Sequence, residues 1–330
     1  MSDPLEGVTP DERRLLRPAR VPRFVEPMKA VLTDERFSDP AWIFERKLDG
    51  IRCVAIKSPD GRVRLLSRNE LSLNDRYPEI ASALERDHAA EIAIDGEVVA
   101  FEGSRTSFAR LARRGHERVA VFLYVFDVMH VAGHDTRRLP LRARKRVLRR
   151  ALDFAGPVRL TPYRNRDGEA LFAEACRKGW EGLIAKRADS TYTSARSRDW
   201  LKLKCGAEQE LVVGGYTAPK GSRVELGALL VGYFEDGRLR YAGKVGTGFD
   251  RQTLHDLSRR LRPLRSERSP FADPELRGRD TTWVEPELVV QVGFSEWTRD
   301  GRLRHPRFLG VREDKDAREV VRERATAAAP

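Results

Sequence analysis

The sequence predicts an α+β fold in two domains, with antiparallel sheets and helices in the first and a small β-barrel in the second. Two observations lead to this prediction. Asp-Gly pairs at Asp60-Gly61, Asp236-Gly237 and Asp300-Gly301 separate short apolar runs, which is typical of β-hairpins. Near Cys205 the pattern changes from mixed helices and strands to mostly short strands. We therefore expect a leader over residues 1–24, a first domain over 25–205 and a second domain over 206–330.

The balance of charged residues favours a polyanionic partner. Lys and Arg number 62 and Asp and Glu number 50, so the formal net charge of the 330 residues is +12. Nucleic acid is the simplest such partner, because basic side chains bind its phosphates and release counterions. A charged surface that only keeps the protein soluble is the alternative. No secretory signal or membrane-spanning stretch is found, so we expect a cytoplasmic protein with no membrane partner.

Two further features set expectations for the chain as a whole. The arginines of residues 1–24 have few apolar neighbours, which predicts a flexible basic leader. Cys53, Cys176 and Cys205 are odd in number and far apart, and the histidines show no ligand spacing with them. We expect a reducing compartment, no disulfide framework and no structural zinc site.

The most informative stretch runs from Glu45 to Arg52. Apolar residues precede Lys47 and resume at Ile51, so a strand, a tight Asp49-Gly50 turn and a second strand are predicted. A lysine at such a turn can act as a nucleophile if its pKa falls below about 10.4. The neighbouring cation Arg52 and partial burial would lower it. Asp49 could orient the amine or face a metal; a solvated surface turn is the alternative.

Further polar residues interrupt apolar strands of the first domain. A strand over 91–100 contains Asp95 and Glu97, which are costly to bury unless they are paired or face a metal. An exposed hairpin Glu is the alternative. The strand over 119–129 is apolar enough to be central, and its Phe126 either stacks on a base or packs in the core.

The remaining elements of this domain are helices and lysine-bearing strands. A helix over 141–154 should point Arg142, Arg144, Arg146 and Arg149 outward, and a second helix covers 170–178. Glu181 and Lys186 bracket a short strand. Lys202 and Lys204 share one strand face, where they would bind a common anion or form a solvated edge pair.

The second domain reads as short strands around one helix. Strands are expected over 211–213, 229–234, 239–245, 288–294 and 302–311, with a helix over 250–264. Five short strands and a helix suit a small closed barrel of the oligonucleotide-binding (OB) type.

Taken in order, these motifs resemble the covalent nucleotidyltransferase superfamily of ATP-dependent DNA ligases, RNA ligases and mRNA capping enzymes. The motifs are Lys-x-Asp-Gly-x-Arg at 47–52, Ser-Arg-Asn at 67–69, Asp-Gly-Glu at 95–97, Phe-Asp at 126–127, Glu-Gly-Leu-Ile-Ala-Lys at 181–186, Trp-Leu-Lys-Leu-Lys at 200–204 and Arg-Glu-Asp-Lys at 312–315. Within the superfamily the chain most resembles the ligase domain of bacterial end-joining DNA ligases. The likeness extends from Pro27 to the end of the chain.

The resemblance implies a nucleotidyltransferase (ATP-grasp-like adenylation) domain followed by an OB-fold domain, and a three-step reaction. Lys47 would attack the α-phosphorus of ATP, the AMP would pass to a 5′-phosphate at a DNA break, and a 3′-hydroxyl would displace it. Splitting a hard step into easier ones is the advantage of such a covalent intermediate.

The resemblance also assigns roles to individual residues. It implies that Glu45 contacts adenine, that Phe126 stacks on it, and that Arg52 and Arg68 lie on the ribose or phosphate side. Glu97 and Glu181 would bind the ribose hydroxyl or Mg²⁺ (or Mn²⁺), with support from Asp49. Phosphates would be bound by Lys186, Arg196, Lys202 and Lys204. Arg312, Asp314 and Lys315 would orient pyrophosphate from the second domain, which implies a hinge near Cys205.

The sequence departs from the family at Glu70, where glycine often follows Ser-Arg-Asn, and this puts the aim of Arg68 in doubt. We expect a stand-alone, monomeric minimal ligase of the bacterial nucleoid that acts on nicked or broken double-stranded DNA in repair or end joining, with Ku as a partner at ends. The alternatives are an RNA ligase or capping-type guanylyltransferase, and a non-catalytic nucleic-acid-binding protein.

Overall fold

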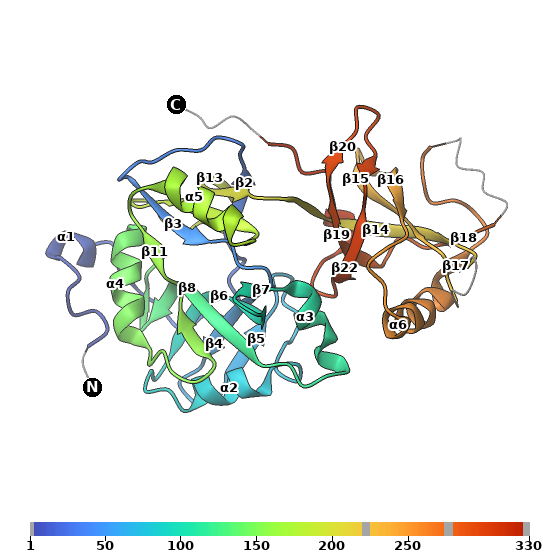
Figure 1. The fold of residues 1–330 in the computed structure, drawn as a ribbon. Helices are drawn as coiled ribbons and strands as arrows, with labels where there is room; N and C mark the ends of the chain where they lie inside the picture. The colour runs from blue at the N-terminus through green and yellow to red at the C-terminus, as the bar shows by residue number, and fades with distance from the viewer. Residues whose placement is uncertain (1–2, 220–224, 274–279, 326–330) are drawn as a thin grey trace. The chain divides into compact units, whose positions relative to one another are not determined.

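The computed structural model describes residues 3–219, 225–273 and 280–325. The chain divides into two compact units, one of residues up to Cys205 and one from Gly206 to Arg324. Figure 1 shows strands at the centre of each unit. In the part of the chain that the structure describes, no helix has the length and apolar character needed to cross a bilayer.

Two sheets build the first unit. The larger has the order β1-β9-β8-β6-β4-β5, with β10 beside β8 and β7 beside β6. Its strands are β1 (Arg17–Pro18), β4 (Ile51–Lys57), β5 (Val63–Leu66), β6 (Ile92–Glu102), β7 (Arg105–Thr106), β8 (Val121–Val131), β9 (His134–Asp135) and β10 (Val158–Leu160). Neighbours are antiparallel except β10 and β8. The predicted central strand is confirmed, because β8 has partners on both sides.

The second sheet has the order β11-β3-β12-β13-β2. Its strands are β2 (Lys29–Leu32), β3 (Trp42–Arg46), β11 (Tyr163–Arg164), β12 (Gly182–Arg187) and β13 (Arg196–Lys204). The pairing of β3 with β12 sets Glu45 opposite Ile184, and the pairing of β12 with β13 sets Lys186 opposite Trp200. Paired residues point to the same face of a sheet. The register therefore gathers side chains from three separate motifs on one face.

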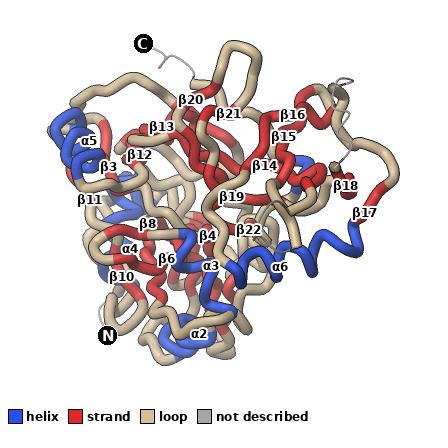
Figure 2. Tube along the Cα trace, turned by 45° about the vertical axis from the view of Figure 1, so that its right-hand side comes forward, coloured by secondary structure: helices blue, strands red, loops and turns tan. Residues whose placement is uncertain are grey.

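Helices surround these strands (Figure 2). They are α1 (Pro10–Arg13), α2 (Pro78–Glu85), α3 (Phe108–Ala112), α4 (Leu141–Ala151) and α5 (Gly168–Arg177), with a 3₁₀ turn η1 (Arg113–Gly115). Helix α4 packs on β8 and α5 on β12. The expectation that Arg144 points outward is wrong: its side chain is fully buried. It follows Leu141 by three residues, so it lies on the same inward face of α4.

The expected flexible leader is instead packed against the first unit. Leu5, Val8 and Leu16 are buried in its main apolar core, and β1 pairs with β9. Thr9 and Glu12 form a capping box at the start of α1. The apolar residues are few, but these three are buried in the same core, and their burial offsets the entropy of ordering the segment.

The structure also contradicts the prediction that no disulfide forms. Cys176, in α5, is bonded to Cys205, the residue after β13, while Cys53 is free and buried. The two cysteines are 29 residues apart in sequence. Antiparallel pairing of β12 with β13, and packing of α5 on β12, bring them together. Sequence spacing could not show this, because the proximity is produced by tertiary packing.

The second unit contains a seven-stranded antiparallel sheet, a separate two-stranded antiparallel sheet and the helix α6. Strands β16, β15, β14, β18 and β17 are neighbours in that order; β19 pairs with both β14 and β22, and β20 pairs with β21. The elements are β14 (Ala207–Thr217), β15 (Leu229–Glu235), β16 (Arg238–Val245), α6 (Arg251–Leu261), η2 (Arg262–Leu264), β17 (Arg265–Ser266), β18 (Thr281–Val284), β19 (Val289–Phe294), β20 (Glu296–Trp297), β21 (Leu303–Arg304), β22 (Arg307–Val311) and η3 (Ala317–Glu319). The predicted strand over 302–311 is interrupted at His305, whose φ is 49°.

Candidate active site

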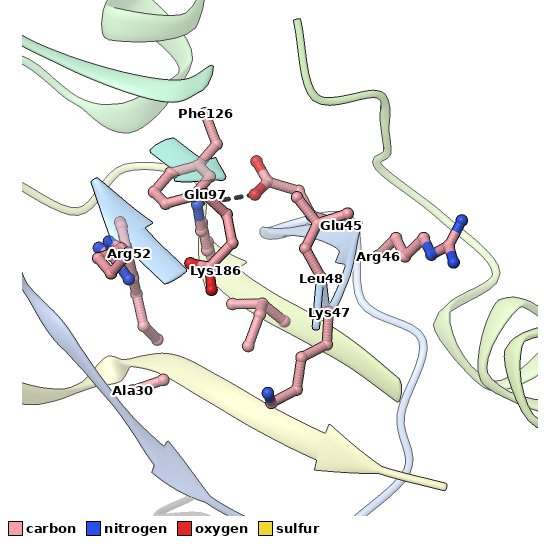
Figure 3. Close-up of a pocket in the computed structure, with 11 residues that line it drawn as sticks. Ala30, Glu45, Arg46, Lys47, Leu48, Arg52, Glu97, Phe126 and Lys186 are labelled. Atoms are coloured by element: carbon pink, nitrogen blue, oxygen red, sulfur yellow. Dashed lines mark ion pairs between the residues drawn. The ribbon is translucent and has the colours of Figure 1, made fainter. Parts of the chain in front are cut away.

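A pocket in the first unit brings the lysine turn together with residues of seven strands, β2, β3, β4, β6, β8, β12 and β13 (Figure 3). Its lining comprises Ala30, Glu45, Arg46, Lys47, Leu48, Arg52, Glu97, Phe126, Ile184, Lys186 and Trp200. Arg46 turns away from the other labelled side chains in Figure 3, and its guanidinium lies 4.5 Å from the ring centre of Trp180. The remaining residues combine two aromatic side chains, three cations and two carboxylates around a single cavity.

Lys47 lies directly after β3, at the mouth of the predicted turn. Its backbone N–H donates to the carbonyl of Gly182 (2.9 Å), and its ammonium forms an ion pair with Glu181. Burial lowers the pKa of the Lys47 amine, but the negative charge of Glu181, with Glu97 and Asp49, outweighs burial and raises it. The expected lowering by Arg52 is therefore wrong, because tertiary packing sets three carboxylates near the amine.

Asp49 fastens the turn instead of pointing into the pocket. One of its carboxylate oxygens accepts the N–H of Phe108, the first residue of α3, at 2.8 Å. Its own N–H donates to the hydroxyl of Thr106 at 3.1 Å. Gly50 is required beside it, since a Cβ there would lie 2.1 Å from the carbonyl oxygen of Val98. These contacts fix the backbone that carries Lys47.

Arg52 is held in place by a buried carboxylate. Its Nε and Nη2 donate to the two oxygens of Asp95 at 2.5 and 2.6 Å, and Asp95 also accepts the hydroxyl of Tyr192 at 2.6 Å. Burial lowers the pKa of Arg52, but Asp95 outweighs it and raises the pKa. The guanidinium lies 4.7 Å from the centre of the Phe126 ring. Asp95 thus meets the requirement that a buried acid be paired.

Glu45 bridges two buried lysines. One oxygen contacts Nζ of Lys145 from α4, and the other lies 2.7 Å from Nζ of Lys186. The Lys186 ammonium also lies 4.1 Å from the ring centre of Phe126 and 3.9 Å from that of Trp200. Burial lowers the pKa of Lys186 to about 8, although Glu45 opposes the change. Its ion pair with Glu45 lacks the geometry of a hydrogen bond, so the ammonium is incompletely satisfied.

The predicted metal ligands are near the lysine but do not form a ready-made cage. Glu97 lines the pocket, and Glu181 contacts Lys47. Among the described residues, Asp87, His88 and Asp153 are the group of three whose ligand atoms lie within 4.8 Å of one another, and neither Glu97 nor Glu181 belongs to it. Mg²⁺ commonly binds through one or two carboxylates together with substrate phosphates. The pair Glu97 and Glu181 fits that mode of binding.

Four other predicted residues of this unit do not line the pocket: Arg68, Arg196, Lys202 and Lys204. Lys202 is paired with Ile184, and Lys204 with Gly182, so both lysines lie on the pocket side of their sheet. The Nη1 of Arg196 donates to the carbonyl of Ala30 at 2.9 Å.

Glu70, which follows Ser-Arg-Asn where the family often has glycine, still allows a hydrogen-bonded turn over residues 67–70. The N–H of Glu70 donates to the carbonyl of Ser67 at 3.0 Å, and Glu70 has a φ of 61°, in the left-handed region where glycine is favoured. Arg68 lies half-buried within this turn.

The three residues predicted in the second unit lie together within that unit. Nε and Nη2 of Arg312 each donate to Asp314 at 2.9 Å, and both side chains are buried. Lys315 Nζ lies 3.7 Å from Glu210.

Sequence reasoning gave no role to several residues at or behind the pocket, among them Ile184, Trp200, Tyr192 and Lys145. Ile184 and Trp200 lie inside the motifs at 181–186 and 200–204. Ile184 is two residues from Lys186 and Trp200 is two residues from Lys202, so strand alternation could have placed both on the pocket side. Tyr192 and Lys145 carry no motif signal. Their position follows only from packing of distant segments.

This fold, a nucleotidyltransferase domain followed by a smaller domain, is that of the ATP-dependent DNA ligases. The family model described as "ATP dependent DNA ligase domain" matches residues 22–204, and the model "ATP dependent DNA ligase C terminal region" matches 222–315. The chain therefore belongs to the ATP-dependent DNA ligase family. The fold class predicted from the sequence, an adenylation domain followed by an OB-fold domain, is confirmed by the same matches.

Individual relatives agree with this assignment. The multifunctional non-homologous end joining protein LigD of Pseudomonas aeruginosa is 40% identical over 320 residues, covering 94% of this chain and 38% of the relative. A DNA ligase of Natronomonas pharaonis is 34% identical over 293 residues, covering 82% of this chain and 51% of the relative. The solved structure of mycobacterial DNA ligase D complexed with ATP and MES matches with a TM-score of 0.65 and 34% identity, covering 91% of this chain and 98% of that one. The chain thus spans less than two fifths of the length of the end-joining relative.

Proposed function

We propose that this protein is an ATP-dependent DNA ligase that seals breaks bearing a 5′-phosphate and a 3′-hydroxyl through a lysyl-AMP intermediate. The observation that carries the proposal is Lys47, whose amine lies in a concave pocket beside Glu181, with Glu45, Arg52 and Phe126 in the same lining. A nucleophilic amine, a ring for stacking and fixed cations are the groups that nucleotidyl transfer requires. The similar mycobacterial structure is described as a complex with ATP, which supports ATP as the nucleotide.

Binding of the nucleotide would use the lining of the pocket. The ring of Phe126 and the side chain of Ile184 come from different sheets and would contact the base, while Glu45 would accept a hydrogen bond from it. The buried ammonium of Lys186, which lacks a well-formed hydrogen bond, would gain partners from the nucleotide. Arg52 would lie on the ribose or phosphate side, held by Asp95.

In the first step the Nζ–P bond forms at the α-phosphorus of ATP as the bond to pyrophosphate breaks. Lys47 must lose a proton before it attacks, and its ion pair with Glu181 opposes that loss by stabilising the ammonium. Any interaction that draws Glu181 away from Lys47 therefore activates the amine. Glu97 and Glu181 are the residues that would hold Mg²⁺ or Mn²⁺, which would supply positive charge to neutralise the phosphates.

In the later steps the AMP moves from Lys47 to a 5′-phosphate, and a 3′-hydroxyl then attacks that phosphate and releases AMP. Lys202 and Lys204, on the pocket side of their sheet, would bind phosphates in these steps. Arg312, Asp314 and Lys315 of the second unit would orient pyrophosphate in the first step. The net charge of +12 suits a polyanionic DNA substrate.

The biological setting is a further part of the proposal. The end-joining relatives support a role in the repair of broken double-stranded DNA. Ku as the partner at ends and a monomeric enzyme are parts of the proposal that rest on the family resemblance. An RNA ligase or a capping-type guanylyltransferase would share Lys47, so nucleotide and strand preferences decide between these functions.

Labelling with nucleotide tests the proposal. Protein incubated with α-³²P-ATP and Mg²⁺ should become covalently labelled, and a chase with nicked duplex DNA should move the label to the DNA. Lys47→Ala should stay unlabelled, whereas Lys178→Ala, which removes an exposed lysine at the end of α5, should label like the wild type. A wild type that takes no label would refute the proposal. Labelling by GTP in place of ATP, or a chase that proceeds only with nicked RNA, would favour the alternatives.

A further inference from the structure

Lys145 lies behind the nucleotide pocket and, among the described residues that line it, forms its ion pair with Glu45. Its side chain extends from α4, is 1% exposed, and contacts Glu45, whose own side chain is 2% exposed. Lys145 does not line the pocket, while Glu45 does. Its ammonium also lies 5.3 Å from the ring centre of Tyr163, a residue paired with Glu45 on the neighbouring strand β11. An unbranched apolar side chain would fill this position without the cost of burying a charge.

The two lysines around Glu45 face different surroundings. Lys186 lines the pocket and lies against the rings of Phe126 and Trp200, where a bound nucleotide competes for it. Lys145 contacts the other oxygen of the carboxylate and does not line the pocket. Glu45 therefore keeps a cationic partner when Lys186 turns to the nucleotide. A buried carboxylate that lost both partners would be strongly destabilised.

The charge of Glu45 decides which purine it can recognise. An ionised carboxylate only accepts hydrogen bonds, whereas a protonated or rotated one can donate or turn away. Adenine offers a 6-amino donor, and a 6-oxo purine presents an acceptor at the same place. A Glu45 carboxylate fixed with an oxygen toward the base thus selects the 6-amino group and disfavours the 6-oxo group.

From these contacts we propose that Lys145 is a positioning residue for nucleotide specificity: its ion pair fixes the orientation of the Glu45 carboxylate so that the pocket selects a 6-amino purine. This inference rests on the proposed function, in which Glu45 faces the base. Lys145 itself touches no reacting atom.

The test compares ATP with ITP, which carries the 6-oxo group but lacks the 2-amino group of GTP. Initial rates of covalent labelling at low nucleotide concentration give kcat/KM for each, and their ratio measures discrimination. Lys145→Met should lower the ATP-to-ITP ratio by about tenfold or more, mainly by slowing the reaction with ATP, because one charged hydrogen bond is worth roughly this factor. Arg150→Met, which removes an exposed cation of the same helix, should leave the ratio unchanged.

A double variant separates positioning from a general loss of fold. If Lys145 acts through Glu45, then adding Lys145→Met to Glu45→Gln should change the ratio no further. A Lys145→Met protein that labels efficiently and keeps the wild-type ratio would overturn the inference and leave the ligase proposal standing. A double variant with a further tenfold loss would also overturn it. A wild type labelled by neither nucleotide would refute the ligase proposal and this inference together.

Discussion

Replacing Arg144 by Met should destabilise the first unit strongly, because Arg144 neutralises a buried carboxylate next to the pocket. Nε and Nη2 of Arg144 donate to Asp127 at 2.7 and 3.0 Å, and both side chains are fully buried. Nη1 also donates to the carbonyls of Leu139 and Ser190. Removing one partner of a buried ion pair costs about 3–5 kcal/mol. At about 2–4 °C per kcal/mol for a domain of this size, the unfolding temperature should fall by about 6–20 °C.

The loss of stability in Arg144→Met should be larger at pH 7 than at pH 4. Burial raises the pKa of the Asp127 carboxyl, but Arg144 outweighs burial and holds the pKa below its usual value. In the wild type this pair therefore contributes stability above about pH 4, and the contribution is lost as the pH falls through the lowered pKa. In Arg144→Met the guanidinium that opposes the effect of burial is gone, so the pKa of the Asp127 carboxyl rises. The penalty of the variant should then grow between about pH 4 and pH 7.

Calorimetry and urea unfolding at pH 4.5 and pH 7 would measure these effects. Arg146→Met is the matched control, since Arg146 is on the same helix in an exposed ion pair with Glu12 and should cost no more than about 1 kcal/mol. The double variant Asp127→Asn/Arg144→Met should recover at least about 1 kcal/mol, because no unpaired charge remains. A single variant within about 1 kcal/mol of the wild type at pH 7, or a double variant no more stable than the single, would refute this reasoning.

Three further predictions follow from the lysine turn and its neighbours. Because Glu181 raises the pKa of Lys47, the rate of lysine adenylation should increase with pH above neutrality. At saturating Mg²⁺, Glu181→Gln should move the midpoint of this pH–rate profile to lower pH. A midpoint that stays in place would contradict the assigned ion pair. Gly50→Ala should destabilise the protein by about 1–3 kcal/mol or more in urea and impair labelling, since its Cβ would lie 2.1 Å from the Val98 carbonyl oxygen. Gly115→Ala, which meets no atom within 4 Å, should be near neutral, and an equal effect of both would count against steric exclusion. Glu70→Gly should raise stability by about 1 kcal/mol, because Glu70 has a φ of 61°; a lower unfolding temperature would show that the Glu70 side chain makes a compensating contact.

Local features of the site could be predicted from the sequence because they depend on neighbouring residues. The strand before Lys47, the turn at Asp49-Gly50 and the alternation of Lys202 with Leu203 follow from chain geometry over a few residues. The need for Asp95 to be paired followed from the cost of burying a charge, although its partners, Arg52 and Tyr192, did not. The family resemblance added the order of the motifs, and with it the two-domain fold.

What only the tertiary structure decided is which charges meet. Glu181 forms an ion pair with Lys47 and reverses the expected direction of the Lys47 pKa shift. Lys145 forms an ion pair with Glu45. Arg144, which the sequence predicted to point into solvent, is buried and neutralises Asp127. The packed N-terminal segment and the bond between Cys176 and Cys205 have the same origin. The physical reason is common to all of them: the strength of an ion pair and the shift of a pKa depend on distance and burial between side chains far apart in sequence. Residue types alone name the possible partners, and packing of the strands and helices selects among them.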